Sequence, residues 1–324
     1  MITENLFLKK FNLQAQQPAP IEISIPSVRD TKDGFYNLWH RLFFVEWDVS
    51  KKYHITLTFS SCNYAGVNLT ALLGAFVCFV RRKLTNSQIH IETKTMNSQV
   101  YLKLKNMELL STFAQYDVPG YNVKTDDIIP YREFLASTKE DEVLSYLERD
   151  WLGKNRLNFS EDVKNSVLSS LWEIYANAFE HSNTFQVNCC GSYDSKNNTL
   201  TLLVGDSGRG IVNCIKEYLD SDIPSTEALK WALIKGNSTY TANLRETGET
   251  QPRGLGFHLL TQLVDLNGGS MEIYTDNIYY LRHEQKDLYD TISYSIKGSW
   301  IRLTLQCKKD VLYYFTNEKI PEYF

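Results

Sequence analysis

The sequence has little of what marks unusual classes of protein, with 8 prolines, 16 glycines and 6 cysteines in 324 residues. So few prolines and glycines, together with a hydrophobic content of 43%, exclude a collagen-like or disordered chain. The most apolar stretch, residues 72–80, is about half as long as the roughly 18 residues of a membrane-spanning helix. Residues 1–4 lack the basic and then apolar profile of a signal peptide. We therefore expect a cytoplasmic protein of about two domains with no membrane partner.

The cysteines and the charges exclude two further classes. The cysteines stand at positions 62, 78, 189, 190, 214 and 307, a spacing that fits neither a zinc ribbon nor a disulfide framework. Lysine and arginine total 34 against 38 aspartate and glutamate residues, which gives a net charge of −4. Because proteins that bind nucleic acid are usually strongly basic, we expect no direct nucleic-acid partner.

Strand and helix patterns alternate in the first part of the chain. Alternating apolar residues predict strands at 21–25, 54–59 and 89–93, and amphipathic spacing predicts helices at 34–44, 69–84 and 107–113. This alternation predicts an α/β or α+β domain over residues 1–125. Turn-forming residues and a helix at 140–151 follow, and we expect residues 126–158 to be a linker.

The second half of the chain begins with a long predicted helix. Ser160 is a suitable N-cap, and apolar side chains recur at 3.6-residue spacing from there to the end of the helix at His181. Strands are predicted at 185–193 and 199–204, helices at 228–234 and 258–266, and further strands at 270–275, 291–296 and 300–306. We expect residues 159–308 to form one domain and residues 309–324 to form a C-terminal tail.

This long helix carries the first group of residues with chemical potential. Glu173 and Asn177 are four residues apart and therefore share one face of the helix. A carboxylate in that position can take a proton from an attacking hydroxyl or water. The amide oxygen of an asparagine is a ligand that Mg²⁺ accepts alongside waters and phosphates. The alternative interpretation is an ordinary solvated helix face.

A second group follows the strand at 199–204, where the sequence reads Asp206-Ser207-Gly208-Arg209-Gly210. An aspartate at the end of a strand can accept a hydrogen bond from an exocyclic amine, and glycines let a flat ring approach the backbone closely. An ordinary aspartate–glycine turn would explain this pattern if it stood alone.

A third group, Arg253-Gly254-Leu255-Gly256, stands directly before the helix at 258–266. The free N–H groups at the start of a helix favour anions such as phosphate. Taken alone, such a pattern is more often structural than functional. The sequence contains neither the P-loop pattern nor the G-x-G-x-x-G pattern of dinucleotide-binding proteins.

In this order the three groups resemble the N-box, the first glycine box and the second glycine box of the GHKL ATPase superfamily. The resemblance runs from residue 160 to residue 306 and includes Gly268-Gly269 before one strand and Gly298-Ser299 at the start of the last. It implies a Bergerat fold, an α/β sandwich in which helices cover one face of a mixed sheet. The fold class expected for the whole chain is α+β.

The resemblance implies a role for each group. Asp206 would bind the adenine amino group of ATP, and Gly208 and Gly210 would shape the purine pocket. Asn177 would hold Mg²⁺ against the phosphates, and Glu173 would be the catalytic residue that activates the nucleophile.

The third group would bind the triphosphate, and the polar segment between the helices would close over it. Gly254, Leu255 and Gly256 would wrap the phosphates with Arg253, and residues 235–253 would form a lid. Residues 276–290 are more than a minimal domain of this superfamily needs. A partner-binding hairpin and a decorated sheet edge both explain this insertion.

Residues 21–114 resemble, less specifically, a STAS domain, the fold of anti-anti-sigma factors. The loop at 64–68 contains no serine at the position where that family is phosphorylated, which implies a module that only binds. The helix expected at 140–151 has no phosphoacceptor histidine, which argues against an autophosphorylating histidine kinase.

Together the resemblances imply a regulatory protein that binds Mg²⁺ and ATP and acts on a protein partner. It would hydrolyse ATP slowly or transfer phosphate to a serine or threonine of that partner, and a homodimer is compatible with both. One alternative is an interaction module that nucleotide switches without phosphotransfer. A scaffold with an inactive nucleotide site is the other.

Overall fold

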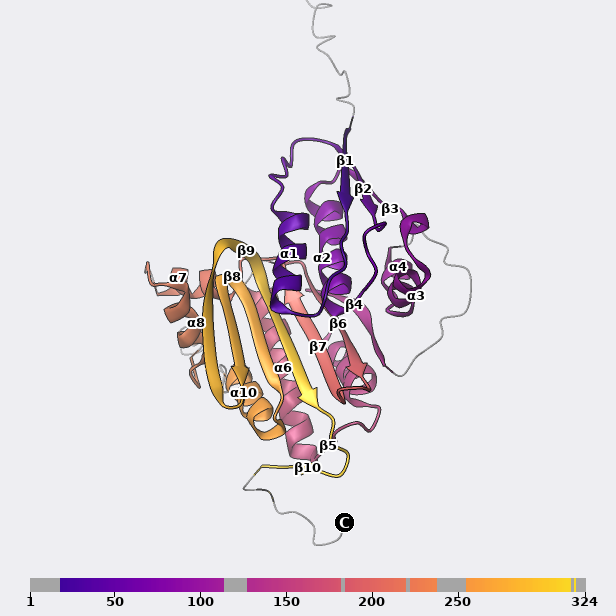
Figure 1. The fold of residues 1–324 in the computed structure, drawn as a ribbon. Helices are drawn as coiled ribbons and strands as arrows, with labels where there is room; N and C mark the ends of the chain where they lie inside the picture. The colour runs from indigo at the N-terminus through magenta and orange to yellow at the C-terminus, as the bar shows by residue number, and fades with distance from the viewer. Residues whose placement is uncertain are drawn as a thin grey trace, which may run out of the picture. The chain divides into compact units, whose positions relative to one another are not determined.

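The computed structural model describes residues 18–113, 127–181, 184–219, 222–237, 255–315 and 318 of the chain (Figure 1). The chain divides into two compact units, Met1–Leu104 and Lys105–Phe324. The sequence predicts the end of the first domain at residue 125, about twenty residues later. The difference arises because the main chain after residue 105 binds the second unit: the N–H of Tyr131 donates to the carbonyl of Met107 at 2.7 Å.

The first unit contains a parallel sheet in the order β1-β2-β3, formed by β1 (Ala19–Ser24), β2 (Tyr53–Thr58) and β3 (Gln88–Ile91). Parallel neighbours require crossover connections, and α1 (Lys32–Phe43) and α2 (Val67–Lys83) provide them. The short helix η1 (Thr93–Thr95) and the start of α3 (Ser98–Asn106) follow β3. The predicted strands and the first two helices are confirmed within a few residues.

The second unit contains a five-stranded sheet in the order β4-β6-β7-β9-β8. Its strands are β4 (Ile128–Leu135), β6 (Gln186–Asp194), β7 (Thr199–Asp206), β8 (Ser270–His283) and β9 (Lys286–Gln306). All four pairings are antiparallel, so the prediction of a mixed sheet is wrong. The reason is that β6–β7 and β8–β9 are hairpins, and antiparallel pairing also adds β4 to β6 and β9 to β7.

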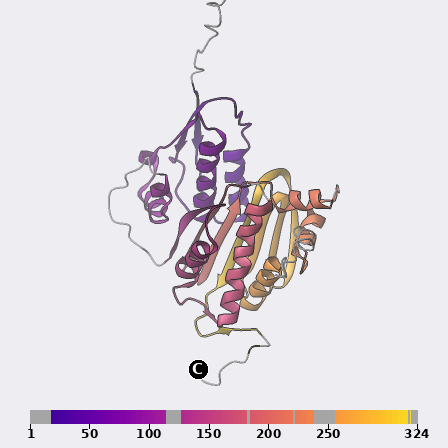
Figure 2. The ribbon, with the colours of Figure 1, turned by 180° about the vertical axis from the view of Figure 1, so that it is seen from behind.

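Helices gather on one face of this sheet, which is the α+β arrangement expected for the chain. The longest is α6 (Glu161–His181), and α10 (Gly256–Asn267) packs beside it, as the view from behind shows (Figure 2). The described residues of the unit also form the helices α4 (Leu109–Thr112), α5 (Glu140–Tyr146), η2 (Leu147–Leu152), α7 (Ile211–Tyr218) and α8 (Ser225–Leu233). The predicted cap of α6 is confirmed, because the hydroxyl of Ser160 accepts the N–H of Val163 at 3.2 Å.

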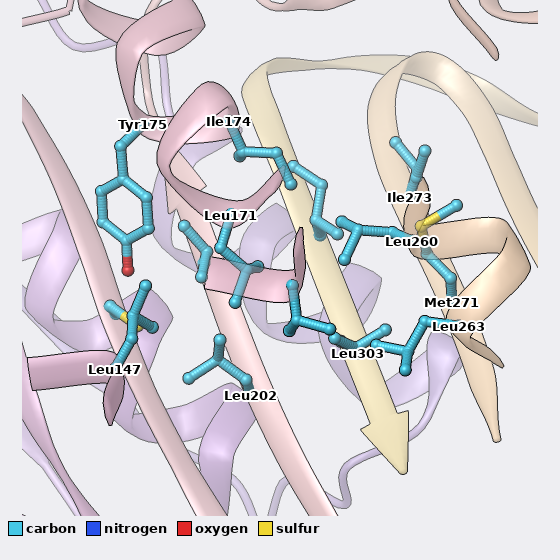
Figure 3. Close-up of a cluster of buried hydrophobic side chains, with 14 of the residues drawn as sticks. Leu147, Leu171, Ile174, Tyr175, Leu202, Leu260, Leu263, Met271, Ile273 and Leu303 are labelled. Atoms are coloured by element: carbon cyan, nitrogen blue, oxygen red, sulfur yellow. The ribbon is translucent and has the colours of Figure 1, made fainter. Parts of the chain in front are cut away.

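A single apolar core lies between these helices and the sheet. Leu171 and Ile174 of α6 and Leu260 of α10 converge on Leu202 and Leu303 of the strands (Figure 3). Each of these side chains is buried, as the 3.6-residue and 2-residue periodicities require.

Two segments expected to lie outside the second domain are parts of it. Within the predicted linker 126–158, β4 forms an edge of the sheet, and Trp151 of η2 is buried in the core. Within the predicted tail, β10 (Leu312–Tyr313) pairs in parallel with β5 (Asn158–Phe159).

All six cysteines are buried and free, as the spacing predicted. Among the residues that the structure describes, no helix is long and apolar enough to cross a bilayer.

Candidate functional site

A cavity of about 790 Å³, part of it open to solvent, lies where α6, α7, α8 and α10 meet the sheet. Glu173 and Asn177 from α6 and Asp206 from β7 all line it. The fold therefore brings together residues from two of the three sequence groups, which are about 30 residues apart in the chain.

Asp206 lies at the end of β7 with its carboxyl group almost completely buried. One carboxylate oxygen accepts the N–H of Gly208 at 2.7 Å, and the other accepts the N–H of Ser299 at 3.3 Å. Burial raises the pKa of Asp206 to about 7, although both hydrogen bonds act in the opposite direction. A carboxyl group with this pKa changes its charge near neutral pH.

Two glycines allow the backbone around Asp206 to pack closely. Gly210 and Gly298 have φ angles of +83° and +80°, which favour glycine. A Cβ atom on Gly298 would overlap the carbonyl oxygen of Asp206, and one on Gly210 would lie 2.5 Å from the carbonyl oxygen of Gly298. Gly208 and Gly210 therefore shape the loop that holds Asp206 and are not themselves among the lining residues.

Ser299 is a lining residue to which the sequence assigned no role. Its hydroxyl accepts the N–H of Ile211 at 2.8 Å and lies 2.9 Å from the hydroxyl of Thr275. Its own N–H donates to the Asp206 carboxylate, so Ser299 links the start of α7 to Asp206. The signal in the sequence is the Gly298-Ser299 pair at the start of a strand.

Glu173 and Asn177 lie one turn apart on α6, half-buried at the side of the cavity. The Glu173 carboxylate accepts the N–H of Gly256, the first residue of α10, at 2.7 Å. A Cβ atom on Gly256 would lie 2.9 Å from that carboxylate oxygen and 3.1 Å from the carbonyl of Ser170. The interpretation of Glu173 as part of a solvated face is therefore wrong. Gly256, the last residue of the third group, contacts the first group directly.

Part of the third group lies outside the described residues. Arg253 and Gly254, most of the predicted lid and the side chain of His181 all fall there. Leu255 is half-buried and precedes α10, where its carbonyl accepts the N–H of Leu259 at 2.9 Å.

The apolar walls of the cavity were not predicted from the sequence. Cys214 and Ile215 come from α7, Trp231 from α8 and Phe257 from α10. Burial raises the pKa of the Cys214 thiol, which therefore stays protonated and packs as a small apolar group. Asn237 contributes a polar group at the end of α8, where its amide donates to the carbonyl of Trp231 at 2.9 Å.

These walls and polar groups suit a ligand with a flat apolar part and a charged part. A ring between apolar side chains would direct a donor toward Asp206, and the oxygens of Asn177 and Glu173 stand at the helix side of the cavity. Among the described residues, no group of three or more His, Cys, Asp or Glu side chains is placed to hold a metal ion. A metal here would need ligands from the bound molecule and from water in addition to Asn177, which is how Mg²⁺ binds nucleotides.

Comparisons with known proteins add no family to this description. The chain matches no protein-family model and no curated protein.

Proposed function

We propose that residues 105–324 bind Mg²⁺ and ATP as a divergent member of the GHKL superfamily. The observation that carries the proposal is the cavity that Glu173, Asn177 and Asp206 line together. These are three of the residues to which the resemblance assigns catalysis, metal binding and adenine binding. Their meeting in one cavity supports a nucleotide site over two unrelated local patterns.

Each residue has a defined part in this function. The Asp206 carboxylate accepts a hydrogen bond from the amino group of adenine, and the backbone N–H groups of Gly208 and Ser299 hold that carboxylate in place. Asn177 contributes an amide oxygen to Mg²⁺, whose charge would offset the negative phosphates when bound. Glu173 orients and deprotonates the attacking hydroxyl or water.

The substrate of the chemical step is water or a serine or threonine hydroxyl on a protein partner. The alternative is a nucleotide-gated interaction module without phosphotransfer. One observation favours keeping this alternative: Glu173, the proposed base, also binds the N-terminus of α10. A nucleotide that changes this contact would move a helix whether or not it is cleaved.

The first unit is proposed to be a STAS-like module that binds a protein partner without being phosphorylated. Its parallel three-stranded sheet with α2 after β2 supports a STAS-like fold. The N–H of Asn68 at the start of α2 donates to the Asp30 carboxylate at 2.7 Å. A Cβ atom on Gly66 would overlap that same carboxylate, so the position before α2 has no room for a phosphorylated side chain.

Calorimetric titration with a non-hydrolysable ATP analogue tests the nucleotide site. We expect Mg²⁺-dependent binding to the full chain, at least a tenfold loss of affinity in Asp206→Asn and wild-type affinity in Asp194→Asn. The control carboxylate lies at the far end of β6, where it accepts N–H groups of a turn. Equal affinity of the wild type and Asp206→Asn would remove the adenine assignment, and no binding by any of the three would overturn the proposed function.

A further inference from the structure

The inserted segment of the second unit is an arm that doubles back on its own domain. The arm is defined as residues 276–298 of β8 and β9, which contain the insertion 276–290. A straight strand of 14 residues would separate the ends of β8 by about 45 Å. However, Nδ1 of His283 lies 3.0 Å from the carbonyl oxygen of Gly269, the residue just before β8. The strand bends at Asp276, which has a φ angle of +46° and interrupts the pairing with β9.

The bend of the arm is bound to α7 and α8. The Asp276 carboxylate accepts the hydroxyl of Ser225 in α8 at 2.8 Å and the ammonium group of Lys216 in α7 at 3.2 Å. It also accepts the hydroxyl of Ser295 from the opposite strand. Burial acts to raise the pKa of Asp276, but these three hydrogen bonds together hold it below its usual value. The carboxylate is therefore charged at neutral pH and joins two helices to the arm.

The far end of the arm is bound to α10. The guanidinium group of Arg282 donates to both carboxylate oxygens of Asp265, with distances of 2.9 and 2.6 Å. It also donates to Asp287 on the opposite strand at 3.0 Å. A two-point arginine–carboxylate pair fixes orientation as well as distance, which a single contact does not.

Apolar packing connects the two ends. Ile278 and Tyr280 are buried in the core of the domain, and the rings of Tyr280 and Tyr289 lie 5.1 Å apart. The ammonium group of Lys230 in α8 lies 5.6 Å from the centre of the Tyr289 ring. The arm is therefore a packed part of the domain and is not a projecting hairpin.

The three helices that the arm binds each contribute an apolar side chain to the wall of the cavity: α7 with Cys214, α8 with Trp231 and α10 with Phe257. We infer that the arm is a brace that sets the distance between the α7–α8 pair and α10, and thereby the affinity of the cavity for its ligand. Asp276 and Arg282 are its positioning residues. That the ligand is a nucleotide rests on the proposed function, whereas the brace itself rests on the contacts above.

Arg282→Gln and the conservative variant Arg282→Lys, which keeps a positive charge between Asp265 and Asp287, test the brace in the full chain. Three quantities are measured on each variant: the affinity for the ATP analogue with Mg²⁺, the midpoint of thermal unfolding, and the alkylation rate of Cys214 by mass spectrometry. We expect Arg282→Gln to bind the analogue about tenfold more weakly, equivalent to about 1.4 kcal/mol. Cys214 should be alkylated faster in Arg282→Gln. Arg282→Lys should lie between this variant and the wild type in both affinity and alkylation rate.

Arg149→Gln is the matched control, because Arg149 also donates to an aspartate, Asp150, but on the surface of η2. It should leave affinity and alkylation unchanged. Ser225→Ala removes one hydroxyl at the bend, and it replaces Arg282→Gln if that variant does not fold. It should weaken binding in the same direction by a smaller factor.

A lower unfolding midpoint with unchanged affinity and unchanged Cys214 alkylation would overturn the brace and leave the arm a purely stabilising element. If the wild type binds no nucleotide, the proposed function fails, and Cys214 alkylation alone decides the inference. Faster alkylation in Arg282→Gln than in Arg149→Gln would then support the brace, and equal rates would overturn it.

Discussion

The carboxylate of Glu173 in α6 and the backbone N–H of Gly256 in α10 are joined by a 2.7 Å hydrogen bond. An anion at the first N–H of a helix is favoured by the helix dipole, and phosphate is favoured by the same groups. Glu173 therefore has two roles in the proposed mechanism, as the base and as a cap on the helix that would contact the phosphates.

Replacing Glu173 with glutamine separates these roles. Glutamine keeps an oxygen for the Gly256 N–H but is no longer a base, so binding of the ATP analogue should change by less than about threefold. ATP turnover or phosphotransfer should fall by about 10² or more, the usual contribution of a general base. Glu180→Gln, on an exposed position of the same helix, serves as the control. Undiminished partner signalling by the glutamine variant would favour the gating alternative over chemistry.

The pKa of Asp206 predicts a pH dependence of stability. Its pKa is about 7 in the folded protein, against the usual 3.8 of an aspartate in an unfolded chain. Between these two pH values the folded state therefore binds more protons than the unfolded state. The free energy of unfolding therefore loses this residue's contribution as pH rises from about 4 to 7. The unfolding midpoint of the wild type minus that of Asp206→Asn should be larger at pH 5.5 than at pH 8. A difference that does not vary with pH would show that Asp206 titrates normally.

The same ionisation predicts the opposite trend for ligand binding. Only the ionised carboxylate is an acceptor at both oxygens, with lone pairs left beyond the two backbone N–H groups. Affinity for the ATP analogue should therefore rise between pH 6 and pH 8. This rise should be absent in Asp206→Asn, and titration calorimetry at several pH values measures it.

Asn177→Ala tests the metal assignment. In the proposed function the amide oxygen contributes to Mg²⁺ and not to adenine, so the variant should lose most of the gain in affinity that Mg²⁺ provides. Binding measured in the presence of a chelator should stay near the wild-type value. Equal losses with and without Mg²⁺ would show that Asn177 contacts the nucleotide itself or supports the fold.

Gly298→Ala tests the close approach between Gly298 and the backbone carbonyl of Asp206. The new Cβ would overlap the Asp206 carbonyl at a φ of +80°, so we expect a loss of about 3 kcal/mol in the free energy of unfolding. Gly268→Ala is the matched control, because Gly268 has a φ of +73° with open space around its Cβ position. It should lose only the backbone strain of about 1 kcal/mol. Similar losses in both variants, by chemical denaturation, would contradict the close approach.

The helices were the most predictable part of the fold. The apolar spacing from Val163 to Ala178 specifies α6, and Ser160 marks its start. In contrast, β4 was missed because Pro130 interrupts it and Arg132 and Glu133 break the alternation, where the register with β6 also shifts. Helix α7 was missed as well, because eight residues after a glycine carry too little periodicity.

The polar half of the candidate site could be predicted, and the apolar half could not. Glu173, Asn177 and Asp206 stand in short local patterns with a chemical meaning. Trp231 and Phe257 are ordinary apolar positions of their helices, and only tertiary packing places them around one cavity. Tertiary packing also explains why the sequence left two interpretations of residues 276–290. Arg282 and Asp265, which bind the arm to α10, are 17 residues apart in the chain.

The place of β4 has a practical consequence for dividing the protein. The resemblance to a nucleotide-binding domain starts near residue 160, so a fragment beginning at residue 159 is the obvious choice. Such a fragment would lack Phe134, whose ring packs against Tyr175 of α6, and Tyr146, whose ring packs against Phe134. It would also leave the backbone of β6 unpaired along one edge, which invites association between copies. A fragment that begins at Lys105 keeps this strand and should remain monodisperse where the shorter one aggregates.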